Sequence, residues 1–248
     1  MTVPATSTEA SGVLRAMLRV LPDDHLLPRA PAFETSALLA ENEAWLREQI
    51  RLRGYIWGID DQFVLGTLWW YSASNWLVMP TVTSWFVTGT ALSARLQDVL
   101  LFHRPDSRIP GSRSLQLGPP SLDQLGAQLR ESLGQVITAV ALITGRGERR
   151  LWSFAVDAIV GRILWAAQQT GRVDEVQQQA SELVAAIDPD LPRPRLTIVE
   201  PSRAQSGERR LHVRRGSCCL LYRVPGEAKC GTCPRQPPHE RLRRLAGH

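Results

Sequence analysis

Four cysteines, the only ones in the chain, lie within sixteen residues near its carboxyl end: Cys218, Cys219, Cys230 and Cys233. Their spacing is C-C-x10-C-x2-C. In a reducing compartment, such a cluster favours metal ligation over disulfide formation. Four thiolates are the usual complement of an iron–sulfur cluster, and four thiolates also hold structural zinc ions.

The two halves of this pattern differ in what they can bind. The C-x2-C half encloses Gly231 and precedes Pro234, so its backbone can turn two sulfurs and several amides toward one point. The vicinal pair is different, because adjacent side chains on an extended segment point to opposite faces. It needs either a tight turn or ligands divided between two irons. This favours an iron–sulfur cluster and leaves zinc, disulfides and free thiols as alternatives.

Positive charge is concentrated around these cysteines. Residues 209–248 hold ten Lys or Arg against two acids and carry +8, which leaves −3 for the rest of a chain whose formal total is +5. This asymmetry indicates a docking surface for an acidic partner or an anionic ligand, with a solvated basic tail as the alternative. The basic residues expected around the sulfurs are Arg209, Arg210, Arg214, Arg215, Arg223, Lys229 and Arg235.

The segment from Arg214 to Pro234 resembles the C-terminal signature of the FhuF-type siderophore-iron reductases. The resemblance rests on the cysteine spacing and on flanking residues over about 21 positions. Those flanking residues are Ser217, Tyr222, Pro225, Gly226, Gly231, Thr232 and Pro234. It implies that Cys218, Cys219, Cys230 and Cys233 bind a [2Fe-2S] cluster.

The resemblance also implies a reaction. An external donor, such as a ferredoxin or another reductase, would supply one electron, and a ferric siderophore would accept it and release Fe(II) in the cytoplasm. A separate donor is expected because the chain has no GxGxxG-type dinucleotide fingerprint. Two other classes stay open: a zinc-stabilised nucleic-acid-binding module and an iron–sulfur redox sensor without turnover. We expect no nucleic acid partner, since neither a helix-turn-helix pattern nor paired zinc knuckles is recognisable.

Four of the basic residues, Arg214, Arg215, Arg223 and Lys229, are the candidates for docking the donor or the anionic ferric complex. A basic neighbourhood should also raise the reduction potential of the cluster, because it stabilises the more negative reduced state. His212 and His239 flank the cysteines and could replace a ligand, as in Rieske centres. With four cysteines available, we expect both histidines to be exposed.

Most of the chain carries helical patterns. Amphipathic helices are predicted at 9–20 and 34–52, separated by a turn at Leu27–Pro31. Further helices are predicted at 121–144, with Ser121 as N-cap and Gly145 as the stop, and at 148–169 and 173–187. The 44% hydrophobic composition is enough to bury a sizeable core.

The stretch from Gln62 to Ala94 has no charged residue and contains four tryptophans. Its length would allow a membrane span. Polar residues and Pro80 interrupt it, and the tryptophans do not gather in two interfacial belts, so we predict two buried helices meeting near Pro80. The tryptophans are expected in the core and not against a siderophore.

The remaining patterns predict a small β component. Residues 91–103 and 113–117 are expected to form a hairpin, 196–199 a strand, and 209–223 one or two more. The fold class is therefore mainly α with a small β component (α+β): a helical bundle core with a C-terminal cysteine-rich iron–sulfur segment. We predict a mostly helical reductase and substrate-binding domain over 1–200 and the cluster-binding segment over 201–248. No secretory signal precedes them, so a cytoplasmic protein is expected, with peripheral membrane contact left open.

Overall fold

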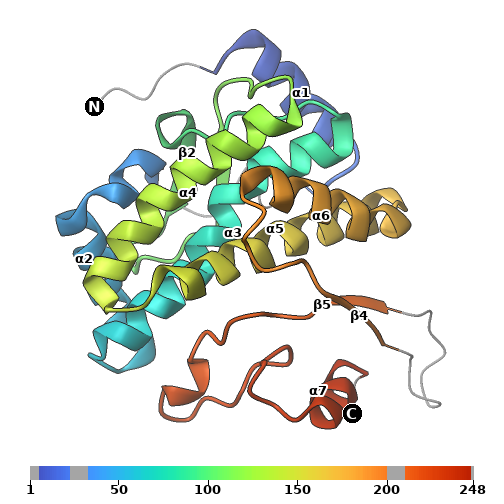
Figure 1. The fold of residues 1–248 in the computed structure, drawn as a ribbon. Coiled ribbons are helices and arrows are strands. Elements are labelled where there is room, and N and C mark those ends of the chain that lie inside the picture. The colour runs from blue at the N-terminus through green and yellow to red at the C-terminus, as the bar shows by residue number, and fades with distance from the viewer. Residues whose placement is uncertain (1–5, 23–32, 200–209, 247–248) are drawn as a thin grey trace.

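The computed structural model describes residues 6–22, 33–199 and 210–246, and it confirms the mainly α fold with small sheets (Figure 1). The helices are α1 (Thr8–Leu18), α2 (Glu43–Trp57), α3 (Gln62–Thr88), α4 (Leu122–Thr144), α5 (Glu148–Thr170), α6 (Val176–Ile187) and α7 (Pro238–Leu245). The strands are β1 (Phe33–Ser36), β2 (Val99–His103), β3 (Gly111–Ser114), β4 (Leu196–Val199) and β5 (Arg210–Val213).

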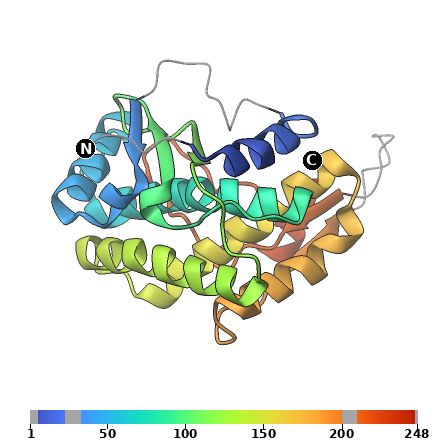
Figure 2. The same cartoon turned by 90° about the horizontal axis from the view of Figure 1, so that it is seen from above.

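Helix α3 runs through the middle of the molecule (Figure 2) and contacts α1, α2, α4, α5 and β3. Most of the uncharged stretch folds into this helix, so its apolar character reflects burial over most of the helix surface. Trp69 and Trp70 are fully buried, as expected of core tryptophans. No helix among the described residues is long and apolar enough to cross a bilayer.

The prediction of two helices meeting near Pro80 was wrong, because α3 continues through that residue. A proline inside a helix lacks the N–H that would bond the carbonyl four residues earlier, here that of Trp76. The Ser112 hydroxyl, on β3, donates to the Trp76 carbonyl oxygen at 2.6 Å. A neighbouring strand thus satisfies the acceptor that Pro80 leaves open, and the helix remains continuous.

Helices α4 and α5 begin and end near the predicted positions. Ser121 caps α4 by accepting a hydrogen bond from the Gln124 N–H, and Gly145 ends that helix in the left-handed conformation at φ 64°. Helix α5 ends in the same way at Gly171, with φ 70°. Left-handed residues at a helix end favour glycine, which has no Cβ to clash. These local signals made the bounds readable from sequence.

The helix predicted at 34–52 was only partly right. Residues 43–52 lie in α2, whereas Phe33–Ser36 form strand β1, followed by the short 3-10 helix η2 (Ala37–Glu41). Strand β1 pairs antiparallel with β2, which pairs with β3. The expected hairpin is therefore confirmed as the second and third strands of a three-stranded sheet. Its first strand is shorter than predicted, and its second strand begins two residues earlier and ends three residues earlier than predicted.

Strands β4 and β5 form a separate antiparallel ribbon next to the cysteine segment. The predicted strand at 196–199 is confirmed. Of the predicted 209–223, the described residues 210–223 contain one strand, Arg210–Val213. The turn expected at Leu27–Pro31 and the domain boundary near residue 200 lie outside the described residues. The division into two domains stays a prediction.

His103, on β2, is buried against the edge of the Trp45 ring, with the ring centroids 5.4 Å apart. Burial, together with the nearby Arg53, lowers the pKa of His103 in the native state to about 4. The unfolded chain therefore binds a proton at this histidine near pH 6.5, whereas the native state does not. We expect His103 to contribute a fall of roughly 2 kcal/mol in the free energy of unfolding between pH 7 and pH 5. Urea unfolding followed by circular dichroism at both pH values measures this fall.

His103→Leu removes the buried imidazole and should therefore remove this contribution to the pH dependence. His239→Leu is the matched control, since it replaces an exposed imidazole in the same way. Parallel profiles for wild type and His103→Leu would contradict the assignment.

Candidate metal centre

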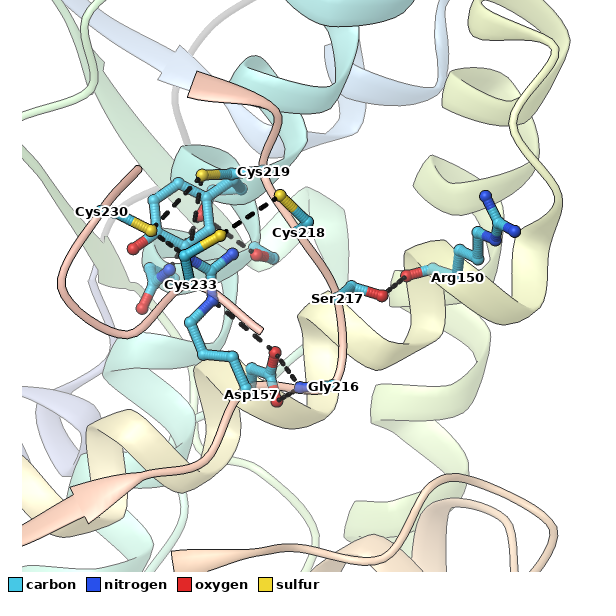
Figure 3. A network of polar contacts seen from close by, with 12 residues as sticks. Arg150, Asp157, Gly216, Ser217, Cys218, Cys219, Cys230 and Cys233 are labelled. Atoms are coloured by element: carbon cyan, nitrogen blue, oxygen red, sulfur yellow. Dashed lines mark hydrogen bonds and ion pairs between the residues drawn. The ribbon is translucent and has the colours of Figure 1, made fainter. Parts of the chain in front are cut away.

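The cysteine segment lies over the face of the helical body formed by α3 and α5 (Figure 1). Strand β5 contacts α5, and the 3-10 helix η5 (Leu221–Arg223) contacts α3. Asp157 of α5 anchors the segment, because both its carboxylate oxygens accept the Gly216 N–H at 3.1 Å. The Ser217 hydroxyl donates to the Arg150 carbonyl oxygen, also at 3.1 Å (Figure 3). Two helix-borne acceptors thus fix the chain immediately before Cys218.

The four cysteine sulfurs face one another in two pairs (Figure 3). The Cys218 and Cys233 sulfurs are 3.7 Å apart, and those of Cys219 and Cys230 are 4.0 Å apart. Each pair joins one member of the vicinal dipeptide to one member of the C-x2-C half. The vicinal cysteines therefore diverge toward different partners, which is the divided arrangement that the sequence allowed.

These distances match the spacing of two thiolates on one tetrahedral metal. Metal–sulfur bonds of about 2.3 Å at tetrahedral angles put two sulfurs about 3.8 Å apart. Each pair thus has the span of two ligands on one ion, and the two pairs together form two such half-sites. Within residues 6–22, 33–199 and 210–246, no three His, Cys, Asp or Glu side chains form a group that could hold one metal ion.

Tight turns in the backbone produce this arrangement. Leu220, directly after the vicinal pair, is left-handed at φ 67°, which is unusual for a residue other than glycine. The Leu220 N–H opposes the burial that raises the pKa of Cys218. The Leu221 N–H adds to the Cys230 hydrogen bond in lowering the pKa of Cys219. In the other half, the Cys233 N–H donates to the Cys230 carbonyl at 2.9 Å. The strained backbone at Leu220 therefore lies next to backbone N–H groups that favour the thiolate forms of Cys218 and Cys219.

A buried arginine lies against one sulfur pair. The Arg215 Nη1 is 3.4 Å from the Cys230 sulfur and 3.7 Å from the Cys219 sulfur. Its guanidinium stacks on the Tyr71 ring at 4.3 Å. Its Nε is 3.9 Å from the Asp157 carboxylate, too far for a hydrogen bond, and Nε and Nη2 have no hydrogen-bond partner among the described residues. Arg215 thus presents a cation with unused donors inside the protein.

A second buried arginine lies near the other pair. Arg146 is held between the rings of Phe63 and Phe154, at 5.3 and 5.5 Å, and its Nη2 donates to the Cys218 carbonyl oxygen at 3.4 Å. Burial lowers the pKa of this guanidinium. Two buried cations beside four thiols need nearby negative charge, since an uncompensated buried charge is costly.

The same electrostatics act on the thiols. The hydrogen bond with Cys230, aided by the Arg215 guanidinium, lowers the pKa of Cys219 to about 5. Burial raises the pKa of Cys218. Asp157 is itself desolvated, and burial raises the pKa of its carboxyl to about 6. The site therefore contains a thiol already disposed to ionise, which is the form that binds metal.

Comparison with known protein families identifies this segment. Residues 215–235 match the FhuF 2Fe-2S C-terminal domain. The match begins at Arg215 and ends at Arg235, so it covers the four cysteines and the residues between them. A search of curated proteins found no match for the chain. The resemblance noted in the sequence is thereby confirmed over residues 215–235, which we call the FhuF-type segment.

The residues of the FhuF-type segment fit a [2Fe-2S] cluster. Four clustered thiols supply the usual ligand set. The unused Arg215 donors and the two buried guanidiniums offer charge and N–H groups to an anionic group lying between the sulfur pairs. The chemistry of the donors and the buried charge around them therefore agree with this cofactor.

The docking candidates are placed differently from one another. Arg214 is exposed, Lys229 is partly exposed, and Arg223 lies 3.3 Å from the Asp61 carboxylate. Arg215 is buried beside the sulfurs, so it cannot offer its charge to a partner at the surface. Arg209 lies outside the described residues. His239 is exposed as expected, whereas His212 is half-buried on β5.

Sequence reasoning missed the helix-borne part of the site: Tyr71 of α3, Arg146, and Phe154 and Asp157 of α5. Asp157 carried a usable signal, because it is the only acid between Trp152 and Trp165 in a strongly apolar helix. An acid at such a position must either face solvent or have buried partners. Nothing in the sequence indicated that its partner lies some sixty residues away.

Proposed function

We propose that this protein is a ferric-siderophore reductase that uses a [2Fe-2S] cluster bound by Cys218, Cys219, Cys230 and Cys233. The observation that carries the proposal is the pairing of the four sulfurs, at 3.7 and 4.0 Å, within the segment that matches the FhuF 2Fe-2S C-terminal domain. In this assignment Cys218 and Cys233 bind one iron, and Cys219 and Cys230 bind the other. When bound, such a cluster supplies transfer of one electron at a time.

The chain positions and shields these ligands. Cys218, Cys219 and Cys233 are 7%, 2% and 1% exposed, so the α3–α5 face and the turns of the segment keep water from three of the four sulfurs. The buried Gln236 amide donates to the Cys230 carbonyl at 2.6 Å and holds the C-x2-C turn in place. A rigid, dry ligand set reduces the reorganisation that accompanies a change of charge.

The substrate in this proposal is an Fe(III) siderophore. It accepts one electron and becomes an Fe(II) complex, while an external donor loses one electron. Siderophores hold iron through hard oxygen donors, so the lower charge of Fe(II) weakens the complex and allows release. The donor is a separate one-electron carrier such as a ferredoxin, since the chain has no dinucleotide-binding fingerprint.

The test is a single-turnover experiment without oxygen. The purified protein is reduced to the point where its visible absorption bleaches, and is then mixed with a ferric siderophore and a chelator that reports Fe(II). We expect recovery of the absorption together with one Fe(II) per protein. The gallium(III) complex of the same siderophore is the control, because it has the same charge and shape but accepts no electron at this potential. A colourless, zinc-loaded protein would instead support the nucleic-acid-binding alternative, and bleaching without transfer the redox sensor.

Exposed basic residues supply the docking surface of the proposal. We expect Arg214→Gln combined with Lys229→Gln to slow reduction by an acidic ferredoxin by about tenfold at low salt, and less at high salt, because screening weakens steering. Stopped-flow rates across a salt series measure the effect. Arg15→Gln with Arg19→Gln removes the same charge at α1, on the opposite side of the helical body (Figure 1). Equal rates for the two double variants would remove the docking role.

A further inference from the structure

The two sulfur pairs have unequal surroundings. Arg215 donates through Nη1 to the sulfurs of Cys219 and Cys230. Arg146, the cation near the other pair, directs its donors to the Cys218 carbonyl oxygen and the Thr67 hydroxyl oxygen. Thus the guanidinium hydrogen bonds to sulfur described here fall on the Cys219–Cys230 pair, whereas Arg146, beside the other pair, bonds to oxygen acceptors.

The two sulfur pairs also differ in their exposure to solvent. Cys230 is half-buried, whereas the other three cysteines are buried. Its neighbours Ala228 and Gly231 are exposed, and Lys229 is partly exposed. The Arg244 guanidinium of α7 donates to the Lys229 carbonyl at 3.0 Å, which fixes this edge of the segment. The sulfur nearest to solvent is therefore in the pair that Arg215 contacts.

We propose that Arg215 is a positioning residue that makes the iron bound by Cys219 and Cys230 the one that gains the electron, and that the electron enters and leaves at the Cys230 edge. The inference rests on the proposed cluster. Hydrogen bonds and positive charge at thiolate sulfur stabilise the added negative charge of the ferrous state. In the step, one Fe(III) becomes Fe(II), the external carrier is oxidised by one electron, and no covalent bond forms or breaks.

Tyr71 and Asp157 hold Arg215 in this role. The Tyr71 ring carries the guanidinium on its face at 4.3 Å, and the Asp157 carboxylate lies 3.9 Å from Nε. Asp157 also fixes Gly216 next to it. The guanidinium is thus constrained from the helix side, and its Nη1 projects toward the two sulfurs. A residue held from two elements and almost excluded from water exerts a stronger field on the sulfurs than a surface arginine does.

The first experiment compares reduction potentials of the iron-loaded variants Arg215→Met and Arg214→Met. Both remove one positive charge, at adjacent positions, and only Arg215 contacts the sulfurs. We expect Arg215→Met to lower the equilibrium constant for reduction at least tenfold, which is 59 mV for one electron, and Arg214→Met to lower it less than threefold. Arg215→Lys, which keeps the charge, should lie between Arg215→Met and wild type. Equal shifts in the two Met variants would overturn the role of Arg215.

The second experiment assigns the iron. Serine is a harder ligand than cysteine and favours Fe(III), so it should lower the potential most at the iron that becomes ferrous. We expect Cys230→Ser to lower the equilibrium constant for reduction at least tenfold more than Cys233→Ser. The reverse order would place the electron on the other iron.

A third measurement needs no substitution. In the reduced wild-type protein, NMR separates cysteines on the ferrous ion from those on the ferric ion by the different paramagnetic shifts of their β protons. We expect the ferrous signature at Cys219 and Cys230, and its appearance at Cys218 and Cys233 would refute the inference even if every variant lost iron. A wild-type protein that binds no cluster would contradict the proposed function itself. That outcome is distinguishable from a cluster whose ferrous iron lies at Cys218 and Cys233, which would contradict only the inference about Arg215.

Discussion

Cys219→Ala should abolish the visible absorption of the purified protein and lower its bound iron about tenfold or more. The substitution removes one of four thiols and leaves the Arg215 guanidinium without the sulfur 3.7 Å from it. It also removes a thiol whose pKa is lowered to about 5, which favours the thiolate form that binds metal. Absorption spectra and iron and sulfide analysis of anaerobically prepared protein measure the loss, which should extend to electron transfer.

His212→Ala is the matched comparison for this prediction. His212 lies on β5, close in sequence to the cysteines, and imidazole ligands do occur in [2Fe-2S] proteins of the Rieske type. We expect this variant to keep its colour and iron, because four cysteines already complete the ligand set. Loss of the cluster in His212→Ala, or full iron content in Cys219→Ala, would show that the ligand assignment is wrong.

Gly126→Ala should lower the free energy of unfolding by about 2 to 3 kcal/mol. Gly126 lies on α4 where that helix meets the end of α6, and an added Cβ would overlap the Ala186 backbone. A backbone cannot rotate aside as a side chain can, so α4 and α6 must move apart and lose packing along their contact. Chemical denaturation followed by circular dichroism gives the change directly.

Gly161→Ala is the same substitution at another helical glycine, and we expect it to raise the free energy of unfolding. Gly161 is inside α5, with no neighbouring atom within 4 Å of an added Cβ. Replacing a helical glycine with alanine reduces the entropy lost on folding, and we expect a gain of about 0.5 to 1 kcal/mol. If both variants were equally destabilised, the close approach of α4 to α6 would not be the cause.

The helical core could be predicted because its signals are local. Ser121 and Gly145 mark the ends of α4 through a side-chain cap and a left-handed glycine, and both act within a few residues of the chain. The uncharged stretch was correctly assigned to the core. The cysteine spacing is also local, and it led to the FhuF-type resemblance of residues 215–235 and to the [2Fe-2S] cofactor.

The errors arose where distant contacts decided the structure. Phe33–Ser36 became a strand because β2, more than sixty residues later, supplies its pairing partners. Helix α3 continues through Pro80 because the Ser112 hydroxyl donates to the Trp76 carbonyl oxygen, to which Pro80 has no N–H to donate. Neither contact has a signature in the residues beside it, so propensity alone gave the wrong element.

In the candidate site, too, the local features could be predicted and the contacts between distant residues could not. Its four candidate ligands were readable from sequence, whereas the contacts that orient Arg215 and anchor the segment come from Tyr71 of α3 and Asp157 of α5. Arg215 is the clearest example. As one of several arginines in a basic tail it was assigned to the surface, and only packing against Tyr71 and Phe154 placed it inside.

Two guanidiniums lie near the Phe154 ring, with Arg146 5.5 Å and Arg215 5.8 Å from its centroid. Aromatic rings attract cations, so this ring helps to hold two positive charges in the interior. Two buried positive charges favour an anionic guest, so binding of an anionic cluster would offset the cost of keeping them away from water. We therefore expect cluster binding to stabilise the packing of the tail against the helices around Phe154.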